Sequence, residues 1–469
     1  MDMTSDSTQY KVLIKRCETY DRDKIQEIVC SGMKELGFQP SGKVYVKPNV
    51  VFASKNGQYG STAYTEPSVV GGSLLALSDE EAVTQVDLGE KTAIGYPTRL
   101  NYKFAGYYKE IKEVKKKAAG PVGIFCIEEE KRDRVFIGGT VHDTLRISRK
   151  MARADQMVYL PKLKCHCVST MTGAVKLNIG ICSDDERAIR HDFLLDDKIV
   201  DLMAVGTPDF IVMDAIDVGV GNEALPTPRR LGLIIMGTNP VAVDIVGAYL
   251  LGHHLDEVPY LKRCVERGYL PSRLQDIEIA GDLTGIDDLD KAAKRIQPYD
   301  DEFYRWQDIE KELKRLKSPI RFYWGYSRHD NKSKCRTGCV MGAKMFFSFQ
   351  ERYAGAAAFE KGKPVVIVIG KLDETIDAEG AEVFLIGSCA NAKILNAKNI
   401  VKIDNCFTTA VDIVLNIRGK LGMPSPALDP KEFGPLVLNT LIASSIKLFK
   451  GRYLQDIGSF LKRGLQKRI

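Results

Sequence analysis

Short apolar runs alternate with amphipathic stretches along the N-terminal three-fifths of the chain, and this alternation limits the possible folds more than any other feature. Helical periodicity is clearest at 22–36 and at 241–251. The apolar runs between such stretches predict strands at 12–15, 44–46, 84–87, 123–127, 157–160, 210–214, 231–236 and 277–279. Strands and helices in alternation predict an α/β fold, a mainly parallel sheet with helices on both faces.

The chain is long enough for more than one domain, at 469 residues. The α/β rhythm covers 1–282 and breaks over 283–330, which we interpret as a helical connector around an amphipathic helix at 301–317. We expect a smaller α/β cysteine domain at 331–469. Its pattern shows no repeat of fixed short period and predicts helices at 339–353 and 408–421 and strands at 364–370, 381–387 and 400–403.

Composition narrows the cellular setting and the kinds of partner. The chain has 67 basic and 61 acidic residues, and a net charge of +6 does not indicate nucleic-acid binding. We find neither a secretory signal pattern nor an apolar run of about 18 residues that would predict a transmembrane helix. We therefore expect a cytoplasmic protein whose 11 cysteines are thiols or metal ligands rather than disulfides.

Four cysteines in the C-terminal part have the placement of a metal centre. Cys335 and Cys339 form a C-x3-C pair that leads into a predicted helix, while Cys389 and Cys406 each follow a predicted strand. Strand ends in α/β units are where sites usually form, and four thiolates satisfy either zinc or an iron–sulfur cluster.

The spacing of these cysteines favours an iron–sulfur cluster, most simply 4Fe-4S, over zinc. Zinc sites often use two short pairs, whereas this chain has one pair and two single, distant ligands. Nearby glycines allow a bulky cluster to approach the backbone. Two alternatives remain: a structural zinc ion, and four unrelated buried cysteines.

A lysine-rich strand end, LPKLKCHCVSTMTGAVKLNIG at 160–180, is the most informative stretch of the chain. If 162–167 is extended, Lys162, Lys164 and His166 lie on one face and repel each other unless an anion lies between them. Hydroxyl, amine and amide groups follow, including Thr172, Lys176 and Asn178. The stretch predicts a carboxylate or phosphate site, with a solvated basic strand edge as the alternative.

Three further segments complete the predicted pocket. Lys47 follows one predicted strand and Asp214 follows another, while Asp244 lies in the first turns of a helix that begins at GTNPVAVD. The simpler interpretation of Asp244 is that it complements the helix dipole. A metal site that uses Cys165, His166, Cys167 and Cys182 is disfavoured, because adjacent residues on opposite faces of a strand rarely bind one ion.

Several segments together resemble a known family. YVKPNVV, TEPSVVGG, ADQMVYLPKLKCHCVSTMTGAVKLNIGI, PDFIVMDAIDVGVGNEALP and LGLIIMGTNPVAVDIVGAYLLG are similar, in order, to the family called domain of unknown function 362, over about residues 40–282. Members often carry ferredoxin-like iron–sulfur modules. The chain differs from the family pattern in two places. Cys165 stands where a threonine is usual, and a domain with four widely spaced cysteines stands in place of the usual ferredoxin repeat. The resemblance implies roles for Lys47, Asn49, Lys162, Lys164, His166, Thr172, Lys176, Asn178, Asp214 and Asp244.

The C-terminal sequence is basic and amphipathic from 453 to 469 and follows an apolar stretch at 433–449. Such a tail can contact acidic lipid or an acidic partner. Packing of its apolar face on the domain is more common. Of the two external contacts, we favour a partner protein or homodimer over a peripheral membrane.

The leading hypothesis from the sequence is an iron–sulfur oxidoreductase or electron-transfer enzyme that acts on a small anionic substrate. Lys162, Lys164, His166 and Lys176 would stabilise negative charge, with His166 or Asp214 handling protons. The cluster would supply single electrons, from a redox partner protein where one is needed. The alternative is a non-redox phospho-ligand binding protein with structural zinc or a structural cluster, and a third possibility is non-redox chemistry at an open-site cluster.

Overall fold

The computed structural model describes residues 10–57, 61–191, 193–297, 306–328, 333–334, 338–404, 408–417 and 419–451. The described residues of Met1–Arg187, Asp196–Tyr299 and Leu438–Ile469 form unit 1. Those of Ala188–Leu195 and Asp300–Val437 form unit 2. The domain limits expected from the sequence, at 282 and 330, stay predictions.

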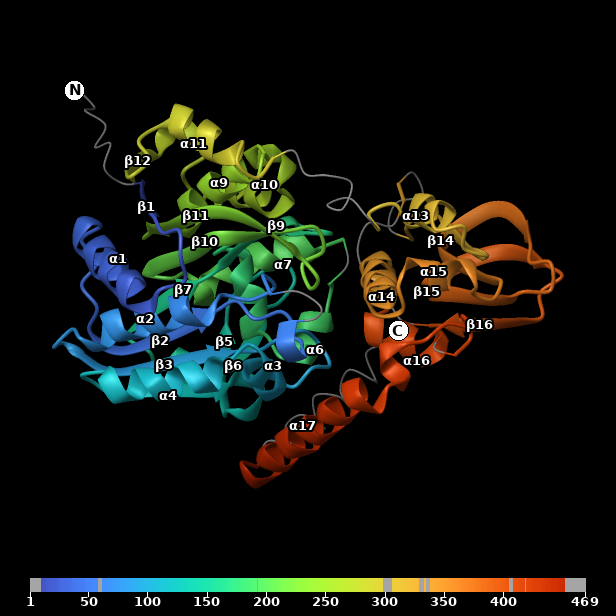
Figure 1. Cartoon of the computed structure of the whole chain (residues 1–469), viewed down its shortest axis with the longest axis horizontal. Coiled ribbons are helices and arrows are strands. Elements are labelled where there is room, and N and C mark those ends of the chain that lie inside the picture. Colours follow the sequence, from blue (N-terminus) through green and yellow to red (C-terminus); the bar gives the residue numbers. More distant parts are fainter. Residues whose placement is uncertain are drawn as a thin grey trace. The chain divides into compact units, whose positions relative to one another are not determined.

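Unit 1 is built on one large, mainly parallel sheet with the strand order β12-β1-β11-β10-β7-β2-β3-β4 (Figure 1). Its central strands are parallel, while β11 is antiparallel to both of its neighbours. The predicted α/β fold class is confirmed. The strands of this unit are β1 (Lys11–Arg16), β2 (Gly42–Pro48), β3 (Val83–Glu90), β4 (Val122–Cys126), β5 (Arg132–Phe136), β6 (Thr144–Ser148), β7 (Gln156–Leu160), β8 (Lys162–His166), β9 (Thr170–Thr172), β10 (Phe210–Val220), β11 (Thr227–Gly237) and β12 (Glu278–Gly281).

Helices cover both faces of this sheet. Apolar side chains of α1, α2 and α4 share one core with Val212 of β10, while Gly247 of α9 lies against Met213, which points to the other face. Local capping follows the sequence, since Asp21 caps α1 and Asn239 caps α9 just before Pro240. The helices are α1 (Arg22–Glu35), α2 (Pro67–Ser78), α3 (Thr98–Phe104), α4 (Tyr107–Lys117), α5 (Arg149–Ala152), α6 (Asp184–Ala188), α7 (Leu195–Asp201), α8 (Met203–Gly206), α9 (Pro240–Leu250), α10 (Pro259–Glu266) and α11 (Ile286–Ala293), with 3-10 turns η1 (Lys55–Gly57), η2 (Ile127–Glu129), η3 (Lys176–Ile181), η4 (Leu255–Glu257) and η5 (Leu274–Asp276).

Unit 2 is a second parallel sheet in the order β13-β14-β15-β16, with helices along one side (Figure 1). Val365 pairs with Glu382, and Glu382 pairs with Asn399, so the offset in sequence from β14 to β15 is repeated from β15 to β16. The sequence interpretation did not find this repeat. The elements are α13 (Ile309–Arg315), β13 (Ile320–Trp324), α14 (Cys339–Ala354), α15 (Ala356–Glu360), β14 (Val365–Asp377), β15 (Glu382–Leu395), β16 (Asn399–Ile403), α16 (Ala410–Ile417) and η6 (Pro426–Leu428).

The strands β14 and β15 both bend sharply. Because they are parallel and only the short segment 378–381 separates them, each must fold back on itself before the next begins. The bends fall at Gly370 and Gly387, which have φ of 80° and 104°, values that favour glycine. A small second core that includes Val366, Ile376 and Val383 fills the space that the bends enclose.

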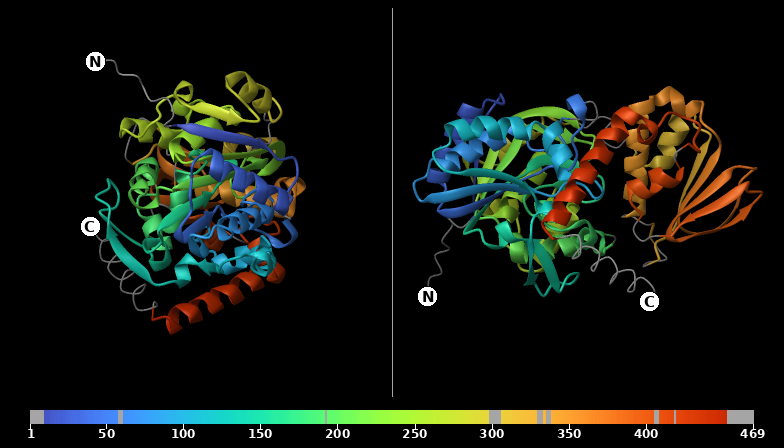
Figure 2. Two further views of the ribbon diagram at one scale, coloured as in Figure 1. Left: turned by 90° about the vertical axis from the view of Figure 1, so that its left-hand side faces the viewer. Right: turned by 90° about the horizontal axis from the view of Figure 1, so that it is seen from below.

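A long helix, α17 (Pro430–Phe449), follows unit 2 in the chain and is drawn in red in Figure 2. By contacts it belongs to unit 2 up to Val437 and to unit 1 from Leu438. Within the described part of the chain, we find no helix that is both long and apolar enough to cross a bilayer.

Candidate functional site

The carboxyl ends of adjacent parallel strands bring charged residues together in unit 1. Lys47 near the end of β2 donates to Glu90 at the end of β3, with 2.6 Å between Nζ and Oε1. Both side chains are buried. Burial lowers the pKa of Lys47 and raises that of Glu90, and the charge of each residue partly offsets the shift of the other. Lys47 is therefore engaged internally rather than open to a ligand.

Lys162 and Asp214, two of the predicted site residues, form a second closed pair. Nζ of Lys162 lies 2.7 Å from Oδ2 of Asp214 and 3.0 Å from the hydroxyl of Tyr20. Asp214 also accepts the N–H of Glu66 at 3.0 Å. Its oxygens are thus occupied by structural donors, and the sequence interpretation missed Tyr20 as part of this network.

Lys164 is the innermost amine of the predicted cluster and is fully buried. Its Nζ donates to the backbone carbonyls of Ala63 and Glu223, each at 2.8 Å. Among the described residues no carboxylate hydrogen-bonds this amine. Burial holds the pKa of Lys164 well below its usual value. Lys164 is therefore an amine whose charge an incoming anion would stabilise.

Lys176, at the start of η3, is half-buried and close enough to Lys164 for its charge to lower the pKa of that amine. Burial lowers the pKa of Lys176 to about 8. Within the described residues its amine has no hydrogen-bond or ion-pair partner. Lys176 thus combines partial access with an unsatisfied positive charge.

Asp244 holds the turn that leads to Lys176. Its carboxylate accepts the N–H groups of Ala174 at 2.5 Å and Val175 at 3.0 Å, and the hydroxyl of Tyr260 at 3.0 Å. A side chain at Gly173 would overlap this carboxylate. Burial raises the pKa of Asp244 to about 7 against the opposing effect of these donors. Asp244 positions the backbone of the site instead of facing a ligand.

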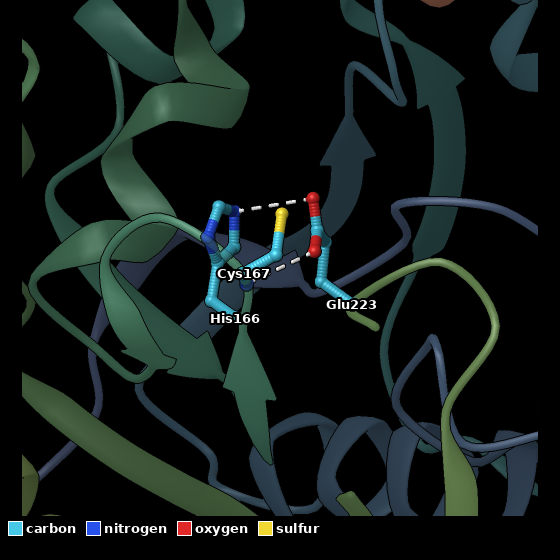
Figure 3. Close-up of side chains that lie close together, drawn as sticks. All are labelled: His166, Cys167 and Glu223. Atoms are coloured by element: carbon cyan, nitrogen blue, oxygen red, sulfur yellow. Dashed lines mark hydrogen bonds and ion pairs between the residues drawn. The ribbon is translucent and has the colours of Figure 1, made fainter. Parts of the chain in front are cut away.

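His166 lies beside a glutamate that the sequence interpretation did not select. The Nε2 atom is 3.6 Å from Oε1 of Glu223, and Oε2 of Glu223 accepts the N–H of Cys167 at 3.2 Å (Figure 3). Burial lowers the pKa of His166 to about 3. Burial alone would raise the pKa of Glu223, but His166, a hydrogen bond from the side chain of Cys167, and Lys176 lower it to about 2. The ring is therefore neutral and the carboxylate charged at neutral pH.

His166, Cys167 and Glu223 have the side-chain types of a metal site, with possible ligand atoms within 4.8 Å of one another. A metal-bound histidine usually donates its second ring N–H to an acceptor. Here Nδ1 of His166 instead accepts N–H groups of Val168 at 3.1 Å and Ser169 at 3.2 Å. The proton of the neutral ring therefore lies on Nε2, and an ion there would require a doubly deprotonated ring. The geometry favours proton handling over metal binding.

The remaining predicted polar residues line the same region of unit 1. Thr172 pairs with Lys164 across the β8–β9 hairpin, so their side chains share a face. The buried Oγ1 of Thr172 and Oδ1 of Asn49 have no hydrogen-bond partner in the described part of the chain. Oδ1 of Asn178 accepts the hydroxyl of Tyr159 at 2.6 Å, which is a structural contact. Thr172 and Asn49 thus offer unused polar atoms, and Asn178 does not.

In unit 2 the structure describes two of the four predicted ligands, Cys339 and Cys389, while Cys335 and Cys406 lie outside the described residues. Cys339 begins α14 and is buried, and Cys389 lies where the register of β15 shifts. The two thiols are near enough for Cys389 to raise the pKa of Cys339, although burial is the larger cause.

The surroundings of Cys339 fit a thiolate ligand. Its Sγ accepts the N–H of Thr408 at 3.3 Å, and such N–H groups are common around cluster sulfurs. Thr408 follows Cys406 by two positions in the sequence. In the sequence, Cys389 and Cys406 are separated by the same offset that pairs Glu382 with Asn399. The described donors are consistent with a metal centre, and the full ligand set remains a prediction.

Comparisons with known proteins agree with the resemblance found in the sequence. A curated relative, Thylakoid-associated protein sll1697 of Synechocystis sp., is 25% identical over 247 residues, which is 50% of this chain and 72% of that protein. A solved structure, the lactate racemase apoprotein of Thermoanaerobacterium thermosaccharolyticum, is 13% identical and covers 80% of this chain and 72% of its own, with a TM-score of 0.29. That score is too low to support an argument.

The family model described as "Domain of unknown function (DUF362)" matches residues 44–249. The match contains β2, β7, β8, η3 and α9, and so every element that carries the lysines, His166 and Asp244. Over residues 44–249 this chain is therefore similar to the DUF362 family, as its sequence motifs indicate.

Proposed function

We propose that this protein is an iron–sulfur-dependent enzyme, an oxidoreductase or electron-transfer protein, that acts on a small carboxylate or phosphate held at the strand ends of unit 1. The observation that carries the anion site is Lys176, whose half-buried amine lacks a partner among the described residues and lies near the buried Lys164. Burial disfavours the charged forms of these two amines, and a bound anion would stabilise them.

Each residue of the anion site has a distinct task in this proposal. Lys176 and Lys164 bind the anion, and the hydroxyl of Thr172 donates a hydrogen bond to it, while the unused amide oxygen Oδ1 of Asn49 can accept a hydroxyl group of the substrate. The pair of His166 and Glu223 handles protons, because the Nε2–H of the neutral ring points toward the carboxylate. Asp214 leaves the catalytic set, since Lys162 already occupies it.

Replacing Lys176 by methionine is expected to reduce the affinity for inorganic phosphate and malonate at least about tenfold, since hydrogen bonds to charged groups contribute roughly 1.5–3 kcal/mol. Isothermal titration calorimetry measures this. The free energy of unfolding should not fall. Burial lowers the pKa of Lys176, so at neutral pH its charged form is less favourable in the folded protein than in the unfolded chain. Lys116→Met, on an exposed helix face, is the matched control.

The same titration has a predicted pH dependence. With a pKa of about 8 in the folded protein, Lys176 is protonated below that pH and neutral above it. Affinity for malonate, whose two carboxylates stay ionised in this window, should therefore fall as pH rises through about 8. Unchanged affinity in Lys176→Met, or affinity that does not respond to pH in this window, would contradict the anion site.

The electron-transfer half of the proposal rests on the cysteines of unit 2. Cys335, Cys339, Cys389 and Cys406 would hold the cluster, and its chemistry would be the transfer of single electrons. The support is the closeness of Cys339 to Cys389 and the N–H that Thr408 directs at Cys339. A cluster that serves catalysis would also need a redox partner protein or the substrate within reach.

Anaerobically purified protein is expected to be brown, with broad visible absorbance that dithionite bleaches and with iron by elemental analysis. Cys339→Ser and Cys389→Ser should each lose most of the colour and iron, because each removes a thiolate ligand. Cys30→Ser, a half-buried cysteine of unit 1, is the matched control and should keep both.

A non-redox anion-binding protein with structural zinc is the second candidate, favoured by the same unpaired Lys176. Colourless protein with stoichiometric zinc that still binds phosphate would select it over the redox enzyme. Cytoplasmic localisation stays a prediction, and the thylakoid association in the name of the cyanobacterial relative makes a membrane-proximal location a competing proposal.

A further inference from the structure

Helix α17 exposes its apolar side. Apolar residues at spacings of three, four and seven form one face, with exposed fractions from 38% to 90%, in Phe433, Val437, Leu438, Leu441, Ile442, Leu448 and Phe449. Ala443, two positions past Leu441 and therefore on the opposite side, is buried. A surface helix of a globular domain normally has the reverse arrangement, and an exposed apolar face of this kind marks a candidate docking surface.

The end of α17 is held against unit 1. Nζ of Lys450 lies 2.5 Å from Oε1 of Glu130, which follows η2. The ion pair and the burial of Ala443 indicate that the side of the helix opposite the apolar stripe contacts the rest of unit 1. The one charged residue of the sequence between Phe433 and Phe449 is Lys447, whose position along the helical repeat lies outside the apolar stripe.

The positive charge of the chain is concentrated immediately beyond this stripe. The segment 447–469 contains seven basic side chains and one acidic side chain, Asp456, which together match the net charge of +6 that the whole chain carries. The rest of the chain is therefore neutral in sum. The apolar face and the whole surplus of basic charge are thus contiguous in the sequence.

We propose that α17 is a membrane-surface helix that docks the protein on a bilayer containing anionic lipid. The apolar face would enter the boundary between headgroups and acyl chains, with the helix axis in the plane of the membrane, while the basic residues contact anionic headgroups. This inference does not depend on the anion site or on the cysteines. It departs from the sequence-based preference for a tail that packs its apolar face on the domain.

The width of the face and the charge beside it argue for lipid over a second copy of the chain. A helix that pairs with another helix needs only a narrow apolar seam. At 3.6 residues per turn, the exposed apolar residues of α17 spread over about half of the helix circumference. Two basic tails brought together in a dimer would also repel each other, whereas an anionic surface attracts both.

Flotation of the full-length chain with vesicles tests this proposal. We expect binding to an equimolar mixture of phosphatidylcholine and phosphatidylglycerol, much weaker binding to phosphatidylcholine alone, and weaker binding at high salt. Leu441→Gln should lower the partition coefficient roughly tenfold by removing apolar surface from the membrane-facing stripe. Leu395→Gln, at an exposed leucine of unit 2, is the matched control and should bind like the parent chain.

A site-specific signal separates lipid contact from unfolding or dimerisation. Phe449→Trp should show a blue shift of tryptophan emission with the anionic vesicles and quenching by brominated lipid, with unchanged circular dichroism. Equal binding to both vesicle types, failure to bind either, or a parent dimer that Leu441→Gln splits in sedimentation velocity would each overturn the proposal.

Discussion

Replacing Glu90 by glutamine is expected to lower the free energy of unfolding of unit 1 by about 3–5 kcal/mol, because it leaves a buried lysine without its counter-ion. Lys47 is fully buried, and its Nζ lies 2.6 Å from Oε1 of Glu90. Glu90 also accepts the N–H of Lys91 at 2.8 Å. Glutamine keeps the shape but can place an amide donor against the lysine, so both the charge and the acceptor geometry suffer.

Urea unfolding can assign this loss to unit 1. The two tryptophans of the chain, Trp306 and Trp324, both lie in unit 2, whereas far-UV circular dichroism reports on both units. The Glu90→Gln transition should therefore move to lower urea by circular dichroism, with little change in the tryptophan transition if the units unfold separately.

Two controls distinguish a buried pair from a general effect of charge. Glu113→Gln breaks an exposed pair with Lys116 and should change stability by less than about 1 kcal/mol. The double variant Lys47→Met with Glu90→Leu should recover much of the loss, because matched apolar residues replace a buried ion pair at little cost. A Glu90→Gln protein as stable as the parent would mean that this pair does not form.

The ion pair of Lys47 with Glu90 shows which features of the site the sequence could predict. The apolar runs located the strands of the site, because strand periodicity is local, but β10 continues to Val220, so Asp214 lies within its strand and not after it. The partner of Lys47 is far along the chain and reaches it only because β2 and β3 are neighbours in a parallel sheet. Lys162 and Asp214 were both selected, yet as separate ligand and catalyst, because nothing local indicates that they pair with each other.

The sequence analysis missed two features. One is Glu223, and the other is the equal offset in sequence from β14 to β15 and from β15 to β16. Glu223 lies in the segment GNEALP, within the stretch that resembles the family, but a single loop glutamate has no periodicity to mark it. The offset was visible in principle, since Cys389 and Cys406 are separated by that same offset and each follows an apolar run. It became meaningful only when the register of β14, β15 and β16 was known.

Asp244 differs from these residues, because the sequence selected it as an anion ligand, whereas in the structure its carboxylate holds the backbone that leads to Lys176. The dipole interpretation was local to α9, whereas the carboxylate reaches across to Ala174 and Val175 at the start of η3. Spacing within one helix cannot reveal such a contact. The sequence does contain one indication of this contact. Gly173 has no side chain, which permits the close approach of the Asp244 carboxylate.

Replacing Asp244 by alanine is therefore expected to lower the free energy of unfolding by about 3–5 kcal/mol and to abolish phosphate binding at Lys176. Two buried N–H groups and the hydroxyl of Tyr260 would lose their acceptor, and each such loss costs about 1–3 kcal/mol. Chemical denaturation followed by circular dichroism measures the first effect and calorimetric titration with phosphate the second.

Gly173→Ala tests the same contact from the other side. Its added methyl group would overlap the Asp244 carboxylate, so this variant should reproduce both losses without touching an ionisable group. Tyr260→Phe removes a single hydrogen bond and should cost only about 1 kcal/mol. Gly120→Ala, where an added methyl meets only ordinary contacts of 3.5 Å and beyond, should change neither property. If Gly173→Ala binds phosphate like the parent protein, the η3 turn does not position Lys176, and the amine must reach the anion by other means.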